Sequence, residues 1–126
     1  MPPLHLFLVC YLLTVAVETA VLLLALSRRH SIARRLFAGV WLTACTYPVV
    51  WYVIPAFIDS VEDRLWYLLV AEAFAPLAEC LIFWAAFVWG RSTDRRATLR
   101  DMAAIVLANL ASFGVGELLN RVGVLS

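Results

Sequence analysis

Residues 65–90 read LWYLLVAEAFAPLAECLIFWAAFVWG, and this stretch indicates the class of fold. A helix needs about 20 apolar residues to cross a hydrocarbon core of roughly 30 Å, and this segment is longer than that. Its only charged residues are Glu72 and Glu79. They are two helical turns apart and therefore lie on one face. The stretch predicts a membrane-spanning helix that carries two acids on one side.

Three other runs of the chain have the same apolar character. They cover residues 4–27, 36–58 and 102–124. Of the 126 residues, 64% are hydrophobic and 15% are charged, whereas roughly half of the residues of a soluble domain are apolar. The linkers between the runs are too short to fold by themselves. We therefore predict an all-α fold, with residues 1–126 forming a single transmembrane domain that is a four-helix bundle.

The basic residues, ten arginines and no lysine, predict the orientation of the chain in the membrane. Eight of them lie in the linkers 28–35 and 91–100, whereas the linker 59–64 is acidic. Loops rich in arginine stay on the cytoplasmic side. We therefore expect both arginine-rich loops in the cytoplasm and both termini outside. The first helix is expected to be retained, because no basic segment precedes it as in a secretory signal. The composition, rich in arginine, alanine and leucine, favours a bacterial inner membrane.

Glu18 and Glu79 lie near the middle of the first and third runs. A charged side chain at mid-bilayer costs at least ~3 kcal/mol, so it needs a partner or a function. A rise of 1.5 Å per residue places both acids within about 4 Å of the midplane, with Thr43 and Asn109 about 6 Å from it on the same side. Ser112 lies one turn from Asn109. We predict that these five residues form a binding site for a substrate or an ion.

Paired acids of this kind have more than one use. Two carboxylates that meet in a dry interior share a proton, and they can hold a cation or exchange it for protons. Glu72 and Glu117 lie nearer the outer surface and are expected to line an access path to the centre. The alternative is structural: protonated acids can hydrogen-bond to neighbouring helices and hold them together, at about 0.6 kcal/mol for each bond.

The two halves of the chain resemble each other. In the first half an arginine linker separates Glu18 from Thr43-x-x-Thr46-Tyr47-Pro48, and in the second it separates Glu79 from Asn109-x-x-Ser112-Phe113-Gly114. The pattern predicts two similar helical hairpins, related by an axis along the membrane normal.

Prolines and small residues predict the shape of the helices. Pro48 and Pro76 each remove a backbone hydrogen bond and are expected to bend the second and third helices. The fourth helix is expected to begin after Asp101, because an acidic residue suits the positive end of the helix dipole. Its small side chains recur every fourth residue and are a candidate dimer contact; they are Ala104, Ala108, Ser112 and Gly116.

The sequence contains no pattern typical of a metal, cofactor or hydrolase site. Cys10, Cys45 and Cys80 are isolated, and His5 and His30 are expected at opposite surfaces. Zinc-binding, nucleophile-elbow and phosphate-loop motifs are absent. One catalytic hypothesis remains, in which a membrane carboxylate acts as a general acid on a lipid-soluble substrate. Because no motif supports it, we expect a protein that is not an enzyme and has no cofactor.

Two functions fit these observations. The first is a small transport protein for a cation or a protonatable solute. In it, Glu18 and Glu79 together bind the transported species and couple its transport. The second is an accessory or assembly subunit of a larger membrane complex, in which the buried acids are structural. The expected partners are the lipid bilayer and either further copies of the chain, as a homo-oligomer, or another membrane subunit. No nucleic acid is expected among them.

Overall fold

The computed structural model describes residues 4–59, 62–88 and 94–123, and these form an all-α structure with four long apolar helices. The first is α1, Leu4–Ala25. The second consists of α2, Ile32–Pro48, continued by η1, Val49–Val53, and η2, Ile54–Ala56. The third consists of α3, Arg64–Phe83, continued by η3, Trp84–Val88, and the fourth is α4, Arg95–Arg121. By length and composition each of the four can cross a membrane.

Two helices begin earlier than the sequence predicts. The Ser31 hydroxyl accepts a hydrogen bond from the Arg34 N–H at 3.1 Å, so α2 begins at Ile32 and not at 36. Asp94 accepts one from the Ala97 N–H at 3.1 Å, so α4 begins at Arg95 and not at 102. Hydropathy marks the lipid-embedded part of a helix, whereas the capping residue determines where it begins. The prediction that Asp101 starts the fourth helix is therefore wrong.

The two prolines have different effects on their helices. Directly after Pro48 the second helix changes from α-helical to π-helical geometry over Val49–Val53. A change of helix type is expected where a backbone N–H is missing. In contrast, α3 continues in α-helical geometry through Pro76 as far as Phe83. A change of helix type accompanies only the first of the two prolines.

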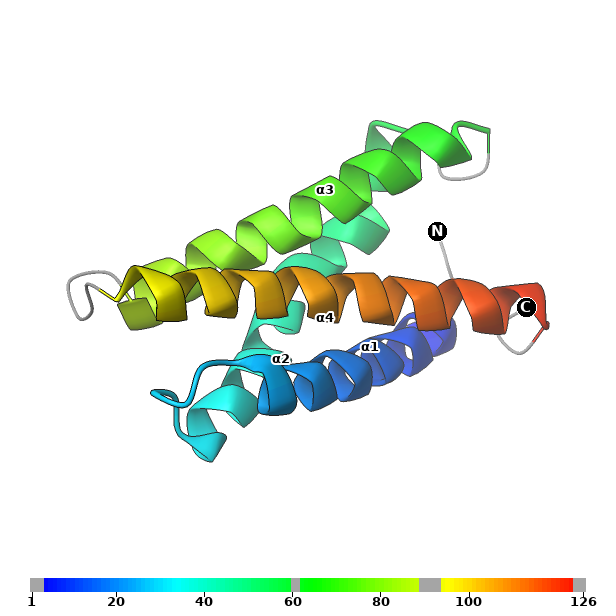
Figure 1. Ribbon diagram of the computed structural model, residues 1–126. Helices are drawn as coiled ribbons and strands as arrows, with labels where there is room; N and C mark the ends of the chain where they lie inside the picture. Colours follow the sequence, from blue (N-terminus) through cyan, green and yellow to red (C-terminus); the bar gives the residue numbers. More distant parts are fainter. Residues whose placement is uncertain (1–3, 60–61, 89–93, 124–126) are drawn as a thin grey trace.

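The four helices are arranged as a ring (Figure 1). Helix α1 packs against α2 and α4, and α3 packs against the same two helices. The start of α1, the end of α4, the end of η2 and the start of α3 lie at one end, here called the terminal end. The connection from α1 to α2, the end of η3 and the start of α4 lie at the other, here called the arginine end (Figure 1). Residues 89–93, which include Arg91 of the predicted 91–100 loop, are outside the described residues.

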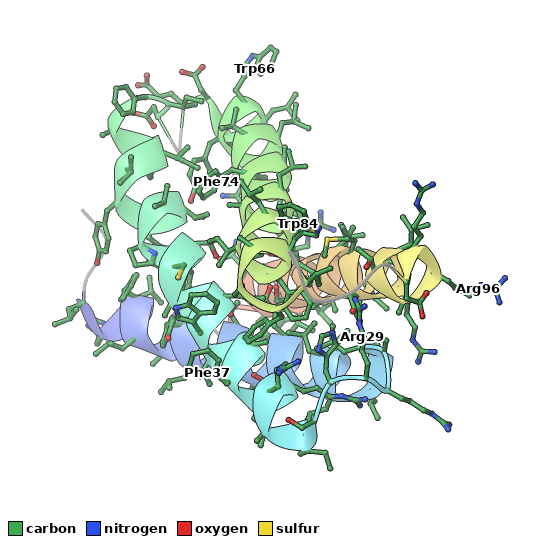
Figure 2. The ribbon with its side chains drawn as sticks, turned by 90° about the vertical axis from the view of Figure 1, so that its left-hand side faces the viewer. Arg29, Phe37, Trp66, Phe74, Trp84 and Arg96 are labelled. Carbon is green, nitrogen blue, oxygen red and sulfur yellow. The ribbon has the colours of Figure 1, made fainter. Side chains whose placement is uncertain are left out.

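The hydrophobic core contains mainly residues from the half of the bundle nearer the arginine end. Its buried members are Leu22, Leu26, Ala38, Leu42, Phe83, Val88, Ala104, Ile105 and Ala108. Outward-facing apolar side chains remain exposed, as Phe37 and Trp66 do, at 54% and 65% (Figure 2). Two members of the small-residue ladder, Ala104 and Ala108, lie inside this core. The bundle itself covers these two residues, so this half of the ladder is not available for a dimer contact.

Candidate functional site

A cavity of about 330 Å³ lies between the helices, in the half of the bundle nearer the terminal end. Every one of the four long helices contributes to its lining. Near the terminal end the lining includes Arg64, Glu117 and Asn120, and deeper in the bundle it includes Glu18 and Glu79. The two central acids predicted from the sequence thus line one cavity, and neither points outward.

Glu18 is held by the close approach of α1 and α2. Its side chain is 2% exposed, and its Oε2 accepts a hydrogen bond from the Thr43 hydroxyl at 2.6 Å. The same hydroxyl lies 2.8 Å from the carbonyl oxygen of Gly39, one turn earlier in α2. A methyl group at Gly39 would collide with Thr19, whose Cα would lie 2.8 Å from it. The lack of a side chain at Gly39 therefore permits the contact between Glu18 and Thr43.

Glu79 has a similar environment with a different partner. It is 3% exposed, and its Oε2 accepts a hydrogen bond from the Thr46 hydroxyl at 3.0 Å. That hydroxyl also lies 3.1 Å from the carbonyl oxygen of Leu42. Thr46 was not among the predicted site residues, although it is three positions after Thr43 and such positions share a helical face. Helix α2 therefore supplies the hydroxyl that binds each acid.

Asn109 and Ser112 also line the cavity, as predicted, from α4. The Asn109 amide donates to the carbonyl oxygen of Ile105 at 2.9 Å, and the Ser112 hydroxyl donates to that of Asn109 at 3.0 Å. They also lie close enough to interact with Glu79 and Glu18 respectively. The predicted symmetry would give Asn109 the place that Thr43 has beside Glu18. The Asn109 amide does lie beside Glu79, and Thr46 of the other hairpin adds a hydrogen bond to this acid at 3.0 Å.

Glu72 and Glu117 line the same cavity closer to the terminal end. Arg64 binds Glu117, with Nη2 of the arginine 2.6 Å from Oε1 of the acid. Both side chains are partly exposed, so this ion pair contributes little to stability. Glu72 is within Coulombic range of both Glu18 and Glu117. The four acids therefore form one electrostatically connected series along the cavity.

The arginine end is closed by a buried cluster that the sequence did not reveal. We call it the inner clamp; it consists of Ser27, Arg29, His30 and Asp101. Asp101 is completely buried in α4. Its carboxylate accepts from the Ser27 N–H at 2.7 Å and from the Ser27 hydroxyl at 3.1 Å. Arg29 and His30 donate to Oδ2 at 2.9 and 2.8 Å. The clamp joins the connection between α1 and α2 to α4, with Arg29 beside α4 in Figure 2.

Other arginines at this end bind the carboxyl terminus of α1. Arg35 donates to the carbonyl oxygens of Leu23 at 2.6 Å, Ser27 at 3.1 Å and His30 at 3.1 Å. Arg100 donates to that of Ala25 at 3.0 Å. The last carbonyls of a helix lack partners within it and carry partial negative charge, so arginine side chains stabilise them. Part of the arginine content is therefore explained by helix capping.

The carboxyl and hydroxyl groups that line the cavity suit a loosely held cation or protons better than a tightly bound metal ion. Among the described residues, no three His, Cys, Asp or Glu side chains converge where a metal ion could bind. Carboxyl groups beside hydroxyls can instead hold a cation loosely or take up protons. The chain matches no protein-family model, no curated protein and no solved structure with which it was compared. Its function must therefore be argued from its own geometry.

Proposed function

We propose that the chain is a small multi-pass membrane protein that transports a cation or a protonatable solute in exchange for protons. In this proposal Glu18 and Glu79 bind the solute and carry the protons, with Thr43, Asn109 and Ser112 beside them. Glu72 and Glu117 line the access path. The observation that carries the proposal is that two buried acids from different helices share one cavity.

The hydrogen bonds of the acids support a role in proton binding. A threonine hydroxyl has one hydrogen to donate. Thr43 contacts both Glu18 and the carbonyl oxygen of Gly39, and Thr46 contacts both Glu79 and that of Leu42. With an ionised acid the hydroxyl donates to the carboxylate, whereas with a protonated acid the acid donates to the hydroxyl and the hydroxyl donates to the backbone carbonyl, so that both contacts are hydrogen bonds. The geometry thus accommodates a proton on each acid. A cation that enters the cavity would displace these protons.

The closed arginine end supports transport by alternating access. The cavity lies at the terminal end, whereas the inner clamp and the hydrophobic core fill the other half. We assign the arginine end to the cytoplasm, following the excess of arginine there. The structure then corresponds to an outward-facing conformation of an inner-membrane protein, and release inside would require the clamp to open. The bundle is small for such motion, so a homo-oligomer is expected, through a face that does not include the buried Ala104 and Ala108.

Flux into liposomes tests the proposal. Purified protein should carry a proton flux that depends on an added cation, and Glu18→Gln or Glu79→Gln should each reduce it at least tenfold because the variant side chain cannot take up a proton. Glu62→Gln is the matched control, since Glu62 is exposed and outside the cavity lining. Unchanged flux in both cavity variants, or no flux with any cation tested, would exclude the transport function.

The accessory-subunit hypothesis predicts a different result. It expects the buried acids to pair with an arginine or amide of another chain, whereas Glu18 and Glu79 both find hydroxyl partners within this one. This observation favours the transport proposal. Purification in a mild detergent distinguishes the two, because an assembly subunit would retain a partner in fixed stoichiometry and a transporter would appear as a single species or a homo-oligomer.

A further inference from the structure

The lining of the cavity indicates a chemical class of solute. Resting on the proposed function, which uses the same cavity, we propose that the solute is a protonated amine with an aromatic or bulky apolar body. The positive N–H group would bind at Glu18 and Glu79. The apolar body would lie among the aromatic side chains nearer the terminal end.

The size of the cavity favours an organic cation over a bare metal ion. A volume of about 330 Å³ is at the lower end of the range for small-molecule sites, which is roughly 300–1,000 Å³. A bare ion instead needs several oxygen ligands converging at short distances. The acids of this cavity are spread along its length from Glu18 to Glu117, and they do not converge on one point.

The wall combines negative charge with aromatic rings. Among the described residues that line the cavity, four are acids, and the one arginine, Arg64, is already paired with Glu117. This balance favours a cation over an anion. Tyr47, Trp51, Tyr67 and Phe113 contribute aromatic rings to the lining. Ring faces attract cations and also cover apolar groups, so one wall can bind both parts of an amphipathic amine.

The second carboxylate oxygen of Glu18 requires a hydrogen-bond donor. Oε1 of Glu18 is buried and has no hydrogen-bond partner among the described residues. The Ser112 hydroxyl lies beside Glu18, and its one hydrogen is directed at the carbonyl oxygen of Asn109, 3.0 Å away. A protonated primary amine has three N–H donors, whereas a quaternary ammonium ion has none. Because Oε1 is covered, the amine would reach it after a small rotation of the Glu18 side chain.

Calorimetric titration of the purified protein with matched probes tests this inference. The probes are 2-phenylethylammonium, its N,N,N-trimethyl derivative, neutral butylbenzene and sodium chloride. We expect the amine to bind at least tenfold more tightly than the trimethyl compound, with no measurable binding of the other two. Glu18→Gln should lower the affinity for the amine at least tenfold. Equal affinity for the trimethyl compound, or unchanged affinity in Glu18→Gln, would overturn the inference.

A pair of tryptophan variants tests the aromatic wall. Trp51→Leu removes a lining ring and should weaken amine binding several-fold. Trp66→Leu removes a tryptophan that is 65% exposed and outside the lining. This variant should therefore bind the amine as tightly as the unaltered protein does. Equal effects of the two variants would exclude the aromatic wall as a binding surface.

The failure of this inference can be distinguished from the failure of the proposed function. If Glu18-dependent flux occurs with an inorganic cation and no amine binds, the amine class is wrong and the transport proposal stands. If the amine binds as expected and no flux occurs with any solute, the binding site stands and transport is excluded.

Discussion

At the scale of single residues, two threonines at the α1–α2 contact have buried hydroxyls, and only one of these hydroxyls is hydrogen-bonded. The Thr43 hydroxyl lies 2.6 Å from Glu18 Oε2, whereas the Thr19 hydroxyl is buried without a hydrogen-bond partner among the described residues. A buried polar atom contributes to stability only when it is paired, and it lowers stability otherwise. The two side chains are therefore expected to respond in opposite ways when the hydroxyl is removed.

Thr43→Val should lower the free energy of unfolding by about 1 kcal/mol, the scale of a hydrogen bond between helices in lipid. Thr19→Val, its matched control of nearly the same shape, should leave stability unchanged or raise it. Thermal unfolding in detergent, followed by circular dichroism, measures both. A larger loss in Thr19→Val than in Thr43→Val would contradict the assigned hydrogen bonds.

His30 in the inner clamp has a defined tautomer. Its Nε2 lies 2.8 Å from Asp101 Oδ2, which can only accept, so Nε2 carries a hydrogen. Its Nδ1 lies 3.3 Å from an Arg34 nitrogen, which can only donate, so Nδ1 carries none. The ring is therefore neutral. Burial lowers the pKa of His30 below 6.5, Asp101 opposes this shift, and the charges of Arg29 and Arg34 add to it.

The lowered pKa of His30 predicts that acid weakens the clamp. Below pH 6.5 the unfolded chain takes up a proton at His30 more readily than the folded one. The stabilising contribution is therefore complete above that pH and is lost as the pH falls through the folded pKa. The unfolding temperature should fall between about pH 7 and about pH 5 more steeply in the unaltered protein than in His30→Gln. Equal slopes in the two proteins would contradict this assignment.

At the scale of elements, the contact between α1 and α2 depends on one glycine. Gly39 is buried against Thr19, one turn before Thr43. Without the close approach that Gly39 permits, the Thr43 hydroxyl would not reach Glu18. A helix-to-helix contact of this kind is typical of small residues in membrane proteins. The position of one acid of the site is therefore a property of two packed helices.

Gly39→Ala should separate α1 from α2, lower the free energy of unfolding by about 1–3 kcal/mol and reduce the proposed flux. Gly114→Ala is the control, because a methyl group there meets nothing within 4 Å. The control should keep its stability or gain up to about 1 kcal/mol from helix propensity. The same unfolding assay compares them. An unchanged Gly39→Ala protein would show that the close contact does not limit the packing.

At the scale of the whole molecule, the two ends of the bundle differ in chemistry. One half contains the acid-lined cavity, and the other contains the apolar core and the inner clamp. Because the two ends differ, the orientation decides on which side of the membrane the cavity opens. In the proposed orientation it would open away from the cytoplasm. The direction of insertion is therefore worth a test of its own.

Single cysteines at the two ends measure the orientation. In a chain whose three native cysteines are replaced by serine, Glu62→Cys should react with a membrane-impermeant thiol reagent in intact cells. Arg96→Cys should react only after the membrane is permeabilised, because it lies on the arginine end (Figure 2). The reverse pattern would overturn the assignment of the arginine end to the cytoplasm.

The sequence by itself determined the all-α class, the four apolar helices and the positions of Glu18 and Glu79 near the middle of their helices. These follow from local properties, because the number of apolar residues and the rise per residue are independent of packing. It misplaced the start of α4 by taking Asp101 for a helix-starting residue. At that position hydropathy changes but the helix does not begin.

Only the tertiary structure decided which side chains meet. Thr46 of the first hairpin hydrogen-bonds to Glu79, Ala104 and Ala108 of α4 are covered within the bundle, and Asp101 binds the connection after α1. The physical reason is that a helix presents several faces. The rotation of each helix about its axis, which decides the face that meets a neighbour, depends on the packing of all four helices together.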